Sequence, residues 1–210
     1  MPRTRRNAVI QRKTTETRIT GALEVDGTGT TDIKTGIGFL DHMLTLFAFH
    51  GLFDLKIRAK GDLEVDKHHT NEDIAICLGK AFKEALGSCE GIRRFGSAEV
   101  PMDQARSKVT IDIGGRYGYS GLTFIGASAQ PNLSSLYTES GSERYSLEDG
   151  NGFLDTFAQN AQLNLHVEVL AGGDAHHILE AVFKACGIAL DQATQIDPRR
   201  KGIPSTKGII

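Results

Sequence analysis

The chain contains an internal repeat, and this repeat restricts its fold more than any other feature. Three segments recur in the same order: GFLD at 38–41 and 152–155, an alternating segment at 53–59 and 165–171, and HHxxE at 68–72 and 176–180. Self-similarity over this length indicates that one structural unit has been duplicated. We expect two half-repeats, residues 1–90 and 91–210, that form one compact duplicated unit.

Hydrophobic periodicity predicts the elements of that unit. Alternating apolar residues predict strands, and apolar residues three and four apart predict helices. In the first half, the strands are predicted at 15–26, 30–35 and 53–59, and the helices at 38–49 and 70–86. In the second half, the strands are predicted at 106–113, 119–125 and 165–171, with one helix near Gly152 and another from His176 or His177 to about Ala193. The unit strand-strand-helix-strand-helix predicts an α/β protein of the α+β two-layer kind, with mixed β-sheets packed on helices.

Composition excludes several classes of protein. A chain of 210 residues buries roughly 70% of its unfolded surface, so its core needs no disulfide or structural metal. The net charge is −2 and both signs are mixed along the chain, which argues against nucleic acid or a membrane as partner. No segment approaches the roughly 20 apolar residues that cross a bilayer. Three cysteines without CxxC spacing fit a reducing compartment, so we expect a cytoplasmic protein.

Three segments lack a clear periodicity. The basic start, residues 1–6, has no apolar run after it, so we expect a frayed terminus and not a signal peptide. Residues 126–150 are rich in Ser, Gly and Asn, and we expect a flexible surface loop. The basic tail, residues 197–210, is also expected to fray.

The HHxxE motifs carry the ligands that first-row transition metals prefer, imidazole and carboxylate. On a helix, the first histidine and the glutamate of each motif share a face, whereas the second histidine points about 100° away. One ion can hardly bind both neighbouring histidines, but two ions can each take one histidine from each pair. A single HH pair would more often be a polar helix start; the repetition in both halves favours a two-metal site.

The remaining histidines are less decisive. His42 stands beside Asp41 early in the first helix and is a further ligand candidate, although a lone histidine is more often a satisfied core residue. His166 alternates within a strand and is interpreted as packing. His50 has no assignment.

Seven segments carry a resemblance to a known family: RKTTET (12–17), GFLDHMLTLFAFHGLFDL (38–55), HHTNEDIAICLG (68–79), GIRRFG (91–96), PMD (101–103), HHILEAVFKA (176–185) and PSTKG (204–208). Together they cover most of the chain in order, and the chain resembles imidazoleglycerol-phosphate dehydratase of histidine biosynthesis. The resemblance implies a lyase that dehydrates D-erythro-imidazole glycerol phosphate to imidazole acetol phosphate. It also implies two manganese ions (Mn²⁺) per site and a large homo-oligomer, a shell of 24 subunits with its sites between subunits.

The resemblance also implies roles for individual residues. One ion would be held by His42, His69, Glu72 and His177, and the other by His68, His176 and Glu180. Catalytic roles would fall to Glu16, His42, His69, Glu72 and Glu180, with Glu16 in the opening strand as the acid/base residue. The phosphate substrate would contact Glu16, Arg94, Arg116, Lys184, Ser205 and Lys207, and the basic tail would close over it. Guanidinium is a good bidentate partner for phosphate.

One position departs from the family pattern. The family usually has a further metal ligand near the start of the second-half helix, and the ungapped alignment places Gly152 there. Glycine offers no side-chain donor, so water would fill the position, or Glu148 or Asp149 would reach it if the preceding segment shifts the register.

Three other functions are compatible with parts of the sequence. A two-metal hydrolase would use the same ligands, and a metal-assembled shell protein could have lost turnover through the change at Gly152. A dinucleotide site built on Gly36 and Gly38 is the weakest interpretation, because Asp41 stands at the third glycine position and no βαβ pattern surrounds it.

Overall fold

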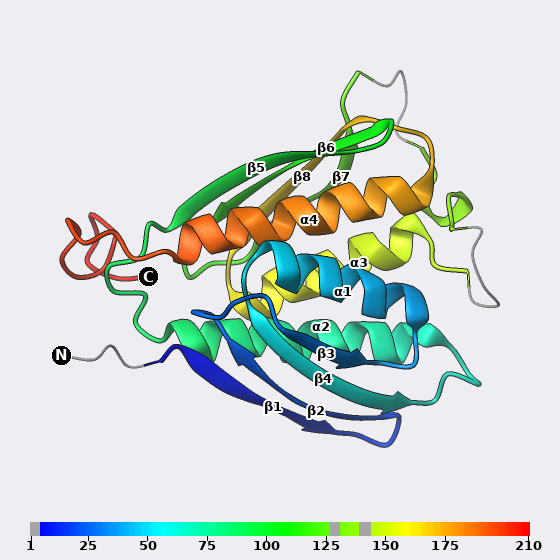
Figure 1. Ribbon diagram of the computed structural model, residues 1–210, viewed down its shortest axis with the longest axis horizontal. Coiled ribbons are helices and arrows are strands. Elements are labelled where there is room, and N and C mark those ends of the chain that lie inside the picture. Colours follow the sequence, from blue (N-terminus) through cyan, green and yellow to red (C-terminus); the bar gives the residue numbers. More distant parts are fainter. Residues whose placement is uncertain (1–4, 127–130, 139–143) are drawn as a thin grey trace.

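Two four-stranded sheets enclose four helices in the computed structural model, which describes residues 5–126, 131–138 and 144–210 (Figure 1). The first half contains β1 (Asn7–Lys13), β2 (Thr17–Glu24), β3 (Thr31–Lys34), α1 (Gly38–His50), β4 (Asp54–Gly61) and α2 (Lys67–Leu86). The second half contains β5 (Phe95–Met102), β6 (Ala105–Asp112), β7 (Gly118–Phe124), the 3-10 turn η1 (Leu133–Ser135), α3 (Leu147–Ala161), β8 (Asn164–Ala171) and α4 (Ala175–Thr194).

The two sheets have the same topology. Their strand orders are β1-β2-β4-β3 and β5-β6-β8-β7, and each sheet combines two antiparallel pairs with one parallel pair. The expected α+β class, its mixed sheets and its duplication are therefore confirmed.

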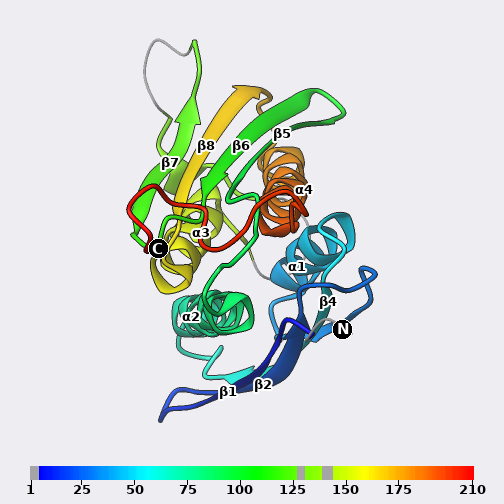
Figure 2. The ribbon, with the colours of Figure 1, turned by 90° about the vertical axis from the view of Figure 1, so that its left-hand side faces the viewer.

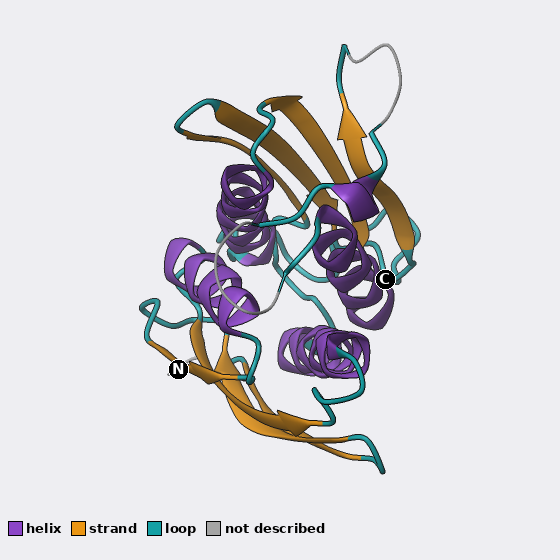
Figure 3. Cartoon of the chain, turned by 90° about the vertical axis from the view of Figure 1, so that its right-hand side faces the viewer, coloured by secondary structure: helices purple, strands orange, loops and turns teal. Residues whose placement is uncertain are grey.

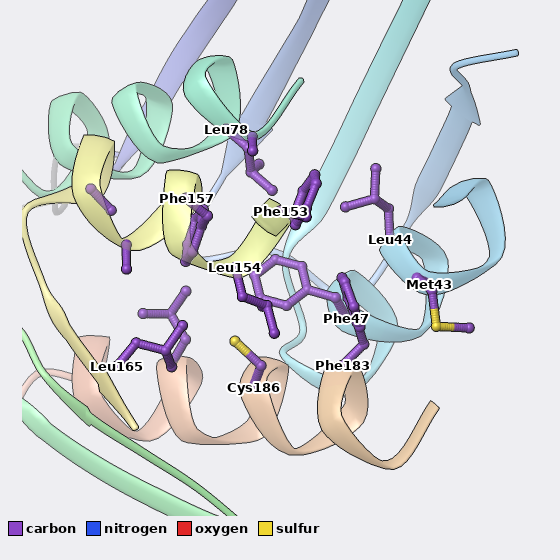
Figure 4. Packing of buried hydrophobic residues seen from close by; sticks show 14 of the residues in the cluster. Met43, Leu44, Phe47, Leu78, Phe153, Leu154, Phe157, Leu165, Phe183 and Cys186 are labelled. Atoms are coloured by element: carbon purple, nitrogen blue, oxygen red, sulfur yellow. The ribbon is translucent and has the colours of Figure 1, made fainter. Parts of the chain in front are cut away.

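The helices form the middle of the molecule. Helices α1 and α2 cover the first sheet, α3 and α4 cover the second, and the halves meet where α2 packs on α3 and α1 on α4 (Figures 2 and 3). Phenylalanines from both halves fill this contact (Figure 4), and the rings of Phe47, Phe53, Phe82 and Phe157 lie with centroids 5.0–6.1 Å apart. Each buried ring contributes roughly 1.5–3 kcal/mol through lost contact with water.

Equivalent glycines allow the helices of the two halves to approach closely. A Cβ on Gly79 of α2 would stand 2.7 Å from the carbonyl oxygen of Phe157. A Cβ on Gly187 of α4 would stand 2.3 Å from the carbonyl oxygen of Phe47. Each glycine lies eleven residues after the first histidine of its motif, so the repeat extends to the packing between halves.

The structure adds one strand to the start of each half. Strand β1 buries Ala8 and Ile10, and β5 buries only the small residues Gly96 and Ala98, so neither has a strong alternating pattern. The predicted strand at 15–26 begins later than expected, because residues 14–16 form the turn between β1 and β2.

The described parts of two segments expected to be loose are packed against the body. Within 126–150, Tyr145 and Leu147 are buried and α3 begins at Leu147, capped by Ser146; residues 127–130 and 139–143 lie outside the described part. In the tail, Pro204 is buried, and a Cβ on Gly115 would stand 2.4 Å from the backbone of Ile210. The predictions of a flexible loop and a frayed tail are therefore wrong for these residues. No described helix is both long and apolar enough to span a bilayer.

Candidate active site

All four helices begin at the same end of the molecule (Figure 1). Aspartates cap the two helices that carry the HHxxE motifs: Asp66 accepts the amide of His68 at 3.0 Å, and Asp174 accepts the amide of His177 at 2.9 Å. An N-cap fixes where a helix begins, so each histidine pair stands in a first helical turn.

One histidine of the first half joins the motif of the second half. The Nε2 atoms of His42 on α1 and His176 on α4 both lie 3.0 Å from Oε1 of Glu180. The candidate ligand atoms of these three side chains lie within 4.8 Å of one another, and within the described residues they are the only such group. Two imidazoles and a carboxylate that converge in this way are the donor set of a transition metal.

Glu180 is prepared as a carboxylate. The residue is only 7% exposed, and its second oxygen accepts a hydrogen bond from Lys184 Nζ at 2.7 Å. Burial raises the pKa of Glu180, but hydrogen bonds from Lys184, His42 and His176 more than offset it and lower the pKa to about 2. Lys184 also lies 3.2 Å from Met102 Sδ. In this chain Lys184 is thus a partner of Glu180, on the metal-ligand side of the molecule.

The motif of the first half lies in a different setting. His68 and Glu72 are exposed, while Nδ1 of His69 lies 3.1 Å from Asp62 and 4.0 Å from Glu16. The hydrogen bond with Asp62 raises the pKa of His69. Glu16 lies in the β1–β2 turn and not, as expected, in a strand.

His177 has two acidic neighbours at longer range. Its Nε2 lies 3.6 Å from Asp103 in the β5–β6 turn, and its Nδ1 lies 3.7 Å from Asp174. The turn of the first hairpin in each half therefore brings an acidic side chain near the second histidine of the motif.

Within one chain, the ligand candidates do not divide as the resemblance implied. His42 was expected with His69, Glu72 and His177, but it lies with His176 and Glu180 instead. Among the described residues, His68, His69, Glu72 and His177 join no group of three ligand atoms within one subunit.

The substrate-contact candidates other than Glu16 and Lys184 lie at the other end of the molecule, away from the helix starts. Arg94 precedes β5 and donates to Asp112 from Nε at 2.6 Å and from Nη2 at 3.0 Å. Its Nη1 donates to the Pro204 carbonyl at 3.0 Å, which places the tail with Ser205 and Lys207 beside it. Arg116 is exposed in the β6–β7 turn.

The length of α4 separates these candidates from the metal ligands. The Arg94 amide donates to Ala193 near the end of α4, whereas His176 stands at its start, about 25 Å away along the helix. Figure 1 shows the tail and the helix starts at opposite ends.

Sequence reasoning missed a structural twin of Arg94. Arg6 precedes β1 and holds Asp26 through Nε at 2.9 Å and Nη2 at 2.5 Å, while its Nη1 donates to the Thr194 carbonyl at 2.6 Å. We call each arrangement an Arg–Asp clasp. The only sequence signal is an arginine immediately before the first strand of each half.

Among the described residues, the surroundings of Gly152 contain space for a ligand but no side chain that replaces one. Gly152 is exposed, and a Cβ built on it would meet no described atom within 4 Å. Asp149 is engaged as the capping-box partner of Ser146 and lies 3.4 Å from Lys67, and Glu148 is exposed.

The fold and the site together define a class: duplicated α+β proteins that gather imidazole and carboxylate groups at the starts of their helices. A family model described as imidazoleglycerol-phosphate dehydratase matches residues 35–190. The chain belongs to this family, whose members are hydro-lyases of histidine biosynthesis.

Individual relatives and solved structures agree. The imidazoleglycerol-phosphate dehydratase of Thermoanaerobacter sp. (strain X514) is 52% identical over 206 residues, covering 98% of this chain and 100% of the relative. That of Chloroflexus aggregans is 51% identical over 208 residues, covering 98% and 95%. The Pyrococcus furiosus structure has a TM-score of 0.76 at 34% identity and covers 96% of this chain and 100% of that one. The Staphylococcus aureus structure has a TM-score of 0.72 at 31% identity and covers 90% and 100%.

Proposed function

We propose that this chain dehydrates D-erythro-imidazole glycerol phosphate to imidazole acetol phosphate, with two Mn²⁺ ions per site, in the cytoplasm. The observation that carries the proposal is the convergence of His42, His176 and Glu180 in a member of a dehydratase family. The donor set suits manganese, because imidazole nitrogens and a carboxylate oxygen are ligands that this ion accepts. A carboxylate with a lowered pKa stays ionised and can bind a cation at neutral pH.

The metal ligands in this proposal are the residues of the two motifs with His42. His176, Glu180 and His42 would bind through the group described above, and His68, His69, Glu72 and His177 would complete the two sites. When bound, the ions would act as Lewis acids that draw electrons from the substrate imidazole ring. Lys184 would hold one oxygen of Glu180 and leave the other for the ion, a role different from the phosphate contact suggested by resemblance.

Proton transfer in this proposal falls to Glu16. Its carboxylate is exposed on the β1–β2 turn and lies beside His69, so it would be near a substrate bound to an ion that His69 holds. A general base must stand within hydrogen-bond reach of the proton that it removes.

The phosphate would be bound by Arg94, Arg116, Ser205 and Lys207. In one chain these residues lie far from the metal ligands, so a site that uses both groups must combine residues of different subunits. This separation supports sites between subunits, and the resemblance gives the proposed assembly as a shell of 24 subunits.

The test is a dehydration assay of the purified protein with Mn²⁺ and synthetic substrate. We expect the product ketone to form, activity to be lost with a chelator and restored by manganese, and Glu16→Gln to bind substrate and metal but lose most turnover. His176→Ala should lower the manganese content, whereas His166→Ala, on an exposed strand position, should not. Release of inorganic phosphate would instead identify a hydrolase. An assembled, metal-loaded protein that forms no product would identify a shell protein without turnover.

A further inference from the structure

A buried carboxylate lies behind the turn that carries Glu16. Asp73, in the second turn of α2, is only 6% exposed, and such a group needs partners for its charge. Its Oδ1 lies 2.7 Å from Arg12 Nη2 at the end of β1, and its Oδ2 accepts a short hydrogen bond from the hydroxyl of Thr17 at the start of β2. One carboxylate thus holds both strands of the hairpin next to their turn.

From Thr17 a chain of hydrogen bonds leads to Glu16. The Thr17 and Thr14 hydroxyl oxygens lie 3.2 Å apart. The single proton of Thr17 is donated to Asp73, so Thr14 donates to Thr17. The Thr14 oxygen then accepts the amides of Glu16 at 3.1 Å and Thr17 at 2.9 Å. Because every hydroxyl is oriented toward the carboxylate, the bonds strengthen one another.

The helix that carries Asp73 also carries His69, the neighbour of Glu16. His69 stands four residues before Asp73 on α2, and Glu16 Oε2 lies 4.0 Å from His69 Nδ1. Figure 1 shows the β1–β2 turn at the same end as the start of α2. The anchor and the histidine therefore move together as parts of one helix.

The second half lacks this anchor. Ala181 occupies the position of Asp73, and the β5–β6 connection is only two residues, Asp103 and Gln104. Among the described residues, the hydrogen-bonded chain occurs only in the half whose turn carries Glu16.

We propose that Asp73 is a positioning residue that, through Thr17 and Thr14, holds the β1–β2 turn so that Glu16 stands beside His69. This inference rests on the proposed role of Glu16 in proton transfer. A displacement of about 1 Å at a reacting group can lower a rate by a hundredfold, so loss of the chain should reduce kcat and leave substrate binding nearly unchanged.

The decisive variant is Thr14→Ala, because it removes the last link and keeps the buried pair of Asp73 and Arg12. We expect kcat to fall roughly tenfold to a hundredfold, with KM and manganese content close to those of the parent protein. Thr14→Ser keeps the hydroxyl and should restore kcat. Thr20→Ala, at an exposed position on β2, is the matched control and should leave kcat unchanged. In a Glu16→Gln background, Thr14→Ala should cause no further loss.

Hydrogen–deuterium exchange gives a second readout that needs no turnover. In peptides that span residues 12–18, Thr14→Ala should speed exchange, because the amides of Glu16 and Thr17 lose their acceptor. Unchanged exchange in Thr14→Ala would overturn the proposal. If Glu16→Gln is inactive, an unchanged kcat in Thr14→Ala would also overturn it. If Glu16→Gln is fully active, the proposed catalytic role of Glu16 fails by itself. Exchange then decides: faster exchange upholds the positioning role and unchanged exchange rejects it.

Discussion

The two halves share a backbone but give the same motif two different environments. Glu180 of the second half is buried and has three hydrogen-bonding partners, whereas Glu72 of the first half is exposed. Among the described residues, the side chain of Glu72 has no hydrogen bond or ion pair. Duplication therefore preserved the strand order and the helix contacts, and the side chains around each carboxylate diverged.

Two positions account for the difference. Four residues after the carboxylate, the second half has Lys184 and the first half has Ile76. Helix α1 contributes His42 to the second-half group, whereas the equivalent position on α3, counted from the GFLD segment, is Thr156. One motif thus gathers its ligands within the subunit, and the other would need ligands from a neighbouring subunit.

The largest expected effect is on stability, in the variants Glu180→Gln and Glu72→Gln. Glu180→Gln leaves Lys184 without its carboxylate in a partly buried site, and loss of one partner of a buried pair costs about 3 kcal/mol. Glu72→Gln changes an exposed group and should alter the free energy of unfolding by less than about 0.5 kcal/mol. Denaturant unfolding of chelator-treated protein measures both, and equal losses would contradict the asymmetry.

The variant Lys184→Met tests whether Lys184 causes the difference between Glu180 and Glu72, and the pH dependence of the free energy of unfolding gives the answer. At neutral pH we expect a loss of about 2 kcal/mol in the free energy of unfolding, because Glu180 loses a charged hydrogen-bond donor. The pKa of Glu180 is lowered from 4.5 to about 2 in the folded protein, so its stabilising contribution is present above 4.5 and disappears as the pH falls toward 2.

The difference between the parent protein and Lys184→Met should therefore shrink over that pH range. The measurement is the unfolding free energy of both proteins at several pH values. A difference that stays constant down to pH 3 would mean that Lys184 acts through packing and not through the charge of Glu180.

The two Arg–Asp clasps can be compared to test whether the clasp at Arg94 contributes to phosphate binding. Asp112→Asn should raise KM for the phosphate substrate about tenfold, since Arg94 loses the carboxylate that orients it and one charge-assisted contact is worth about 1.5–3 kcal/mol. Asp26→Asn breaks the equivalent clasp at Arg6, whose Nη1 donates to Thr194 and not to the Pro204 carbonyl of the tail, and should leave KM unchanged.

Both variants should lose similar, small amounts of stability, at most about 1 kcal/mol, because the clasps are partly exposed. Steady-state kinetics at saturating manganese measure KM. An equal rise in KM for both variants would mean that the clasp at Arg94 is only structural.

The features that sequence could predict are local and periodic. The repeat, the starts of α1 and α4 and the ligand candidates follow from short motifs such as HHxxE and GFLD, whereas α3 begins at Leu147, five residues before its GFLD segment. Strand β5 was missed because its inward residues include Gly96 and Ala98, which give little hydrophobic signal. Likewise, Tyr145 is buried in a polar segment whose composition indicated a loop.

The contacts that sequence could not predict join distant residues. His42 and Glu180 are 138 positions apart, and they meet only because α1 packs on α4. The clasps join residues 18 and 20 positions apart across a strand pair, where no periodic pattern links the partners. The assignment of ligands to two separate ions was made by resemblance, and the geometry of one subunit groups His42 differently.

The smallest expected effects concern the aspartates at the starts of α2 and α4. In the first half the tasks are divided: Asp66 caps the helix, and Asp62 binds His69. In the second half Asp174 caps the helix and is also the acidic neighbour of His177, at 3.7 Å. Loss of a cap costs about 1 kcal/mol, and loss of a carboxylate behind a metal-binding histidine weakens metal affinity about tenfold or more.

We therefore expect Asp66→Ala to lower stability without changing manganese affinity, and Asp62→Ala to lower affinity with little change in stability. Asp174→Ala should do both, because one side chain performs both tasks. Thermal unfolding of the metal-free protein and manganese titration separate the two quantities. If Asp174→Ala lowered stability alone, Asp174, at 3.7 Å, would not assist metal binding by His177. The two halves would then also differ in whether a carboxylate supports the second histidine of the motif.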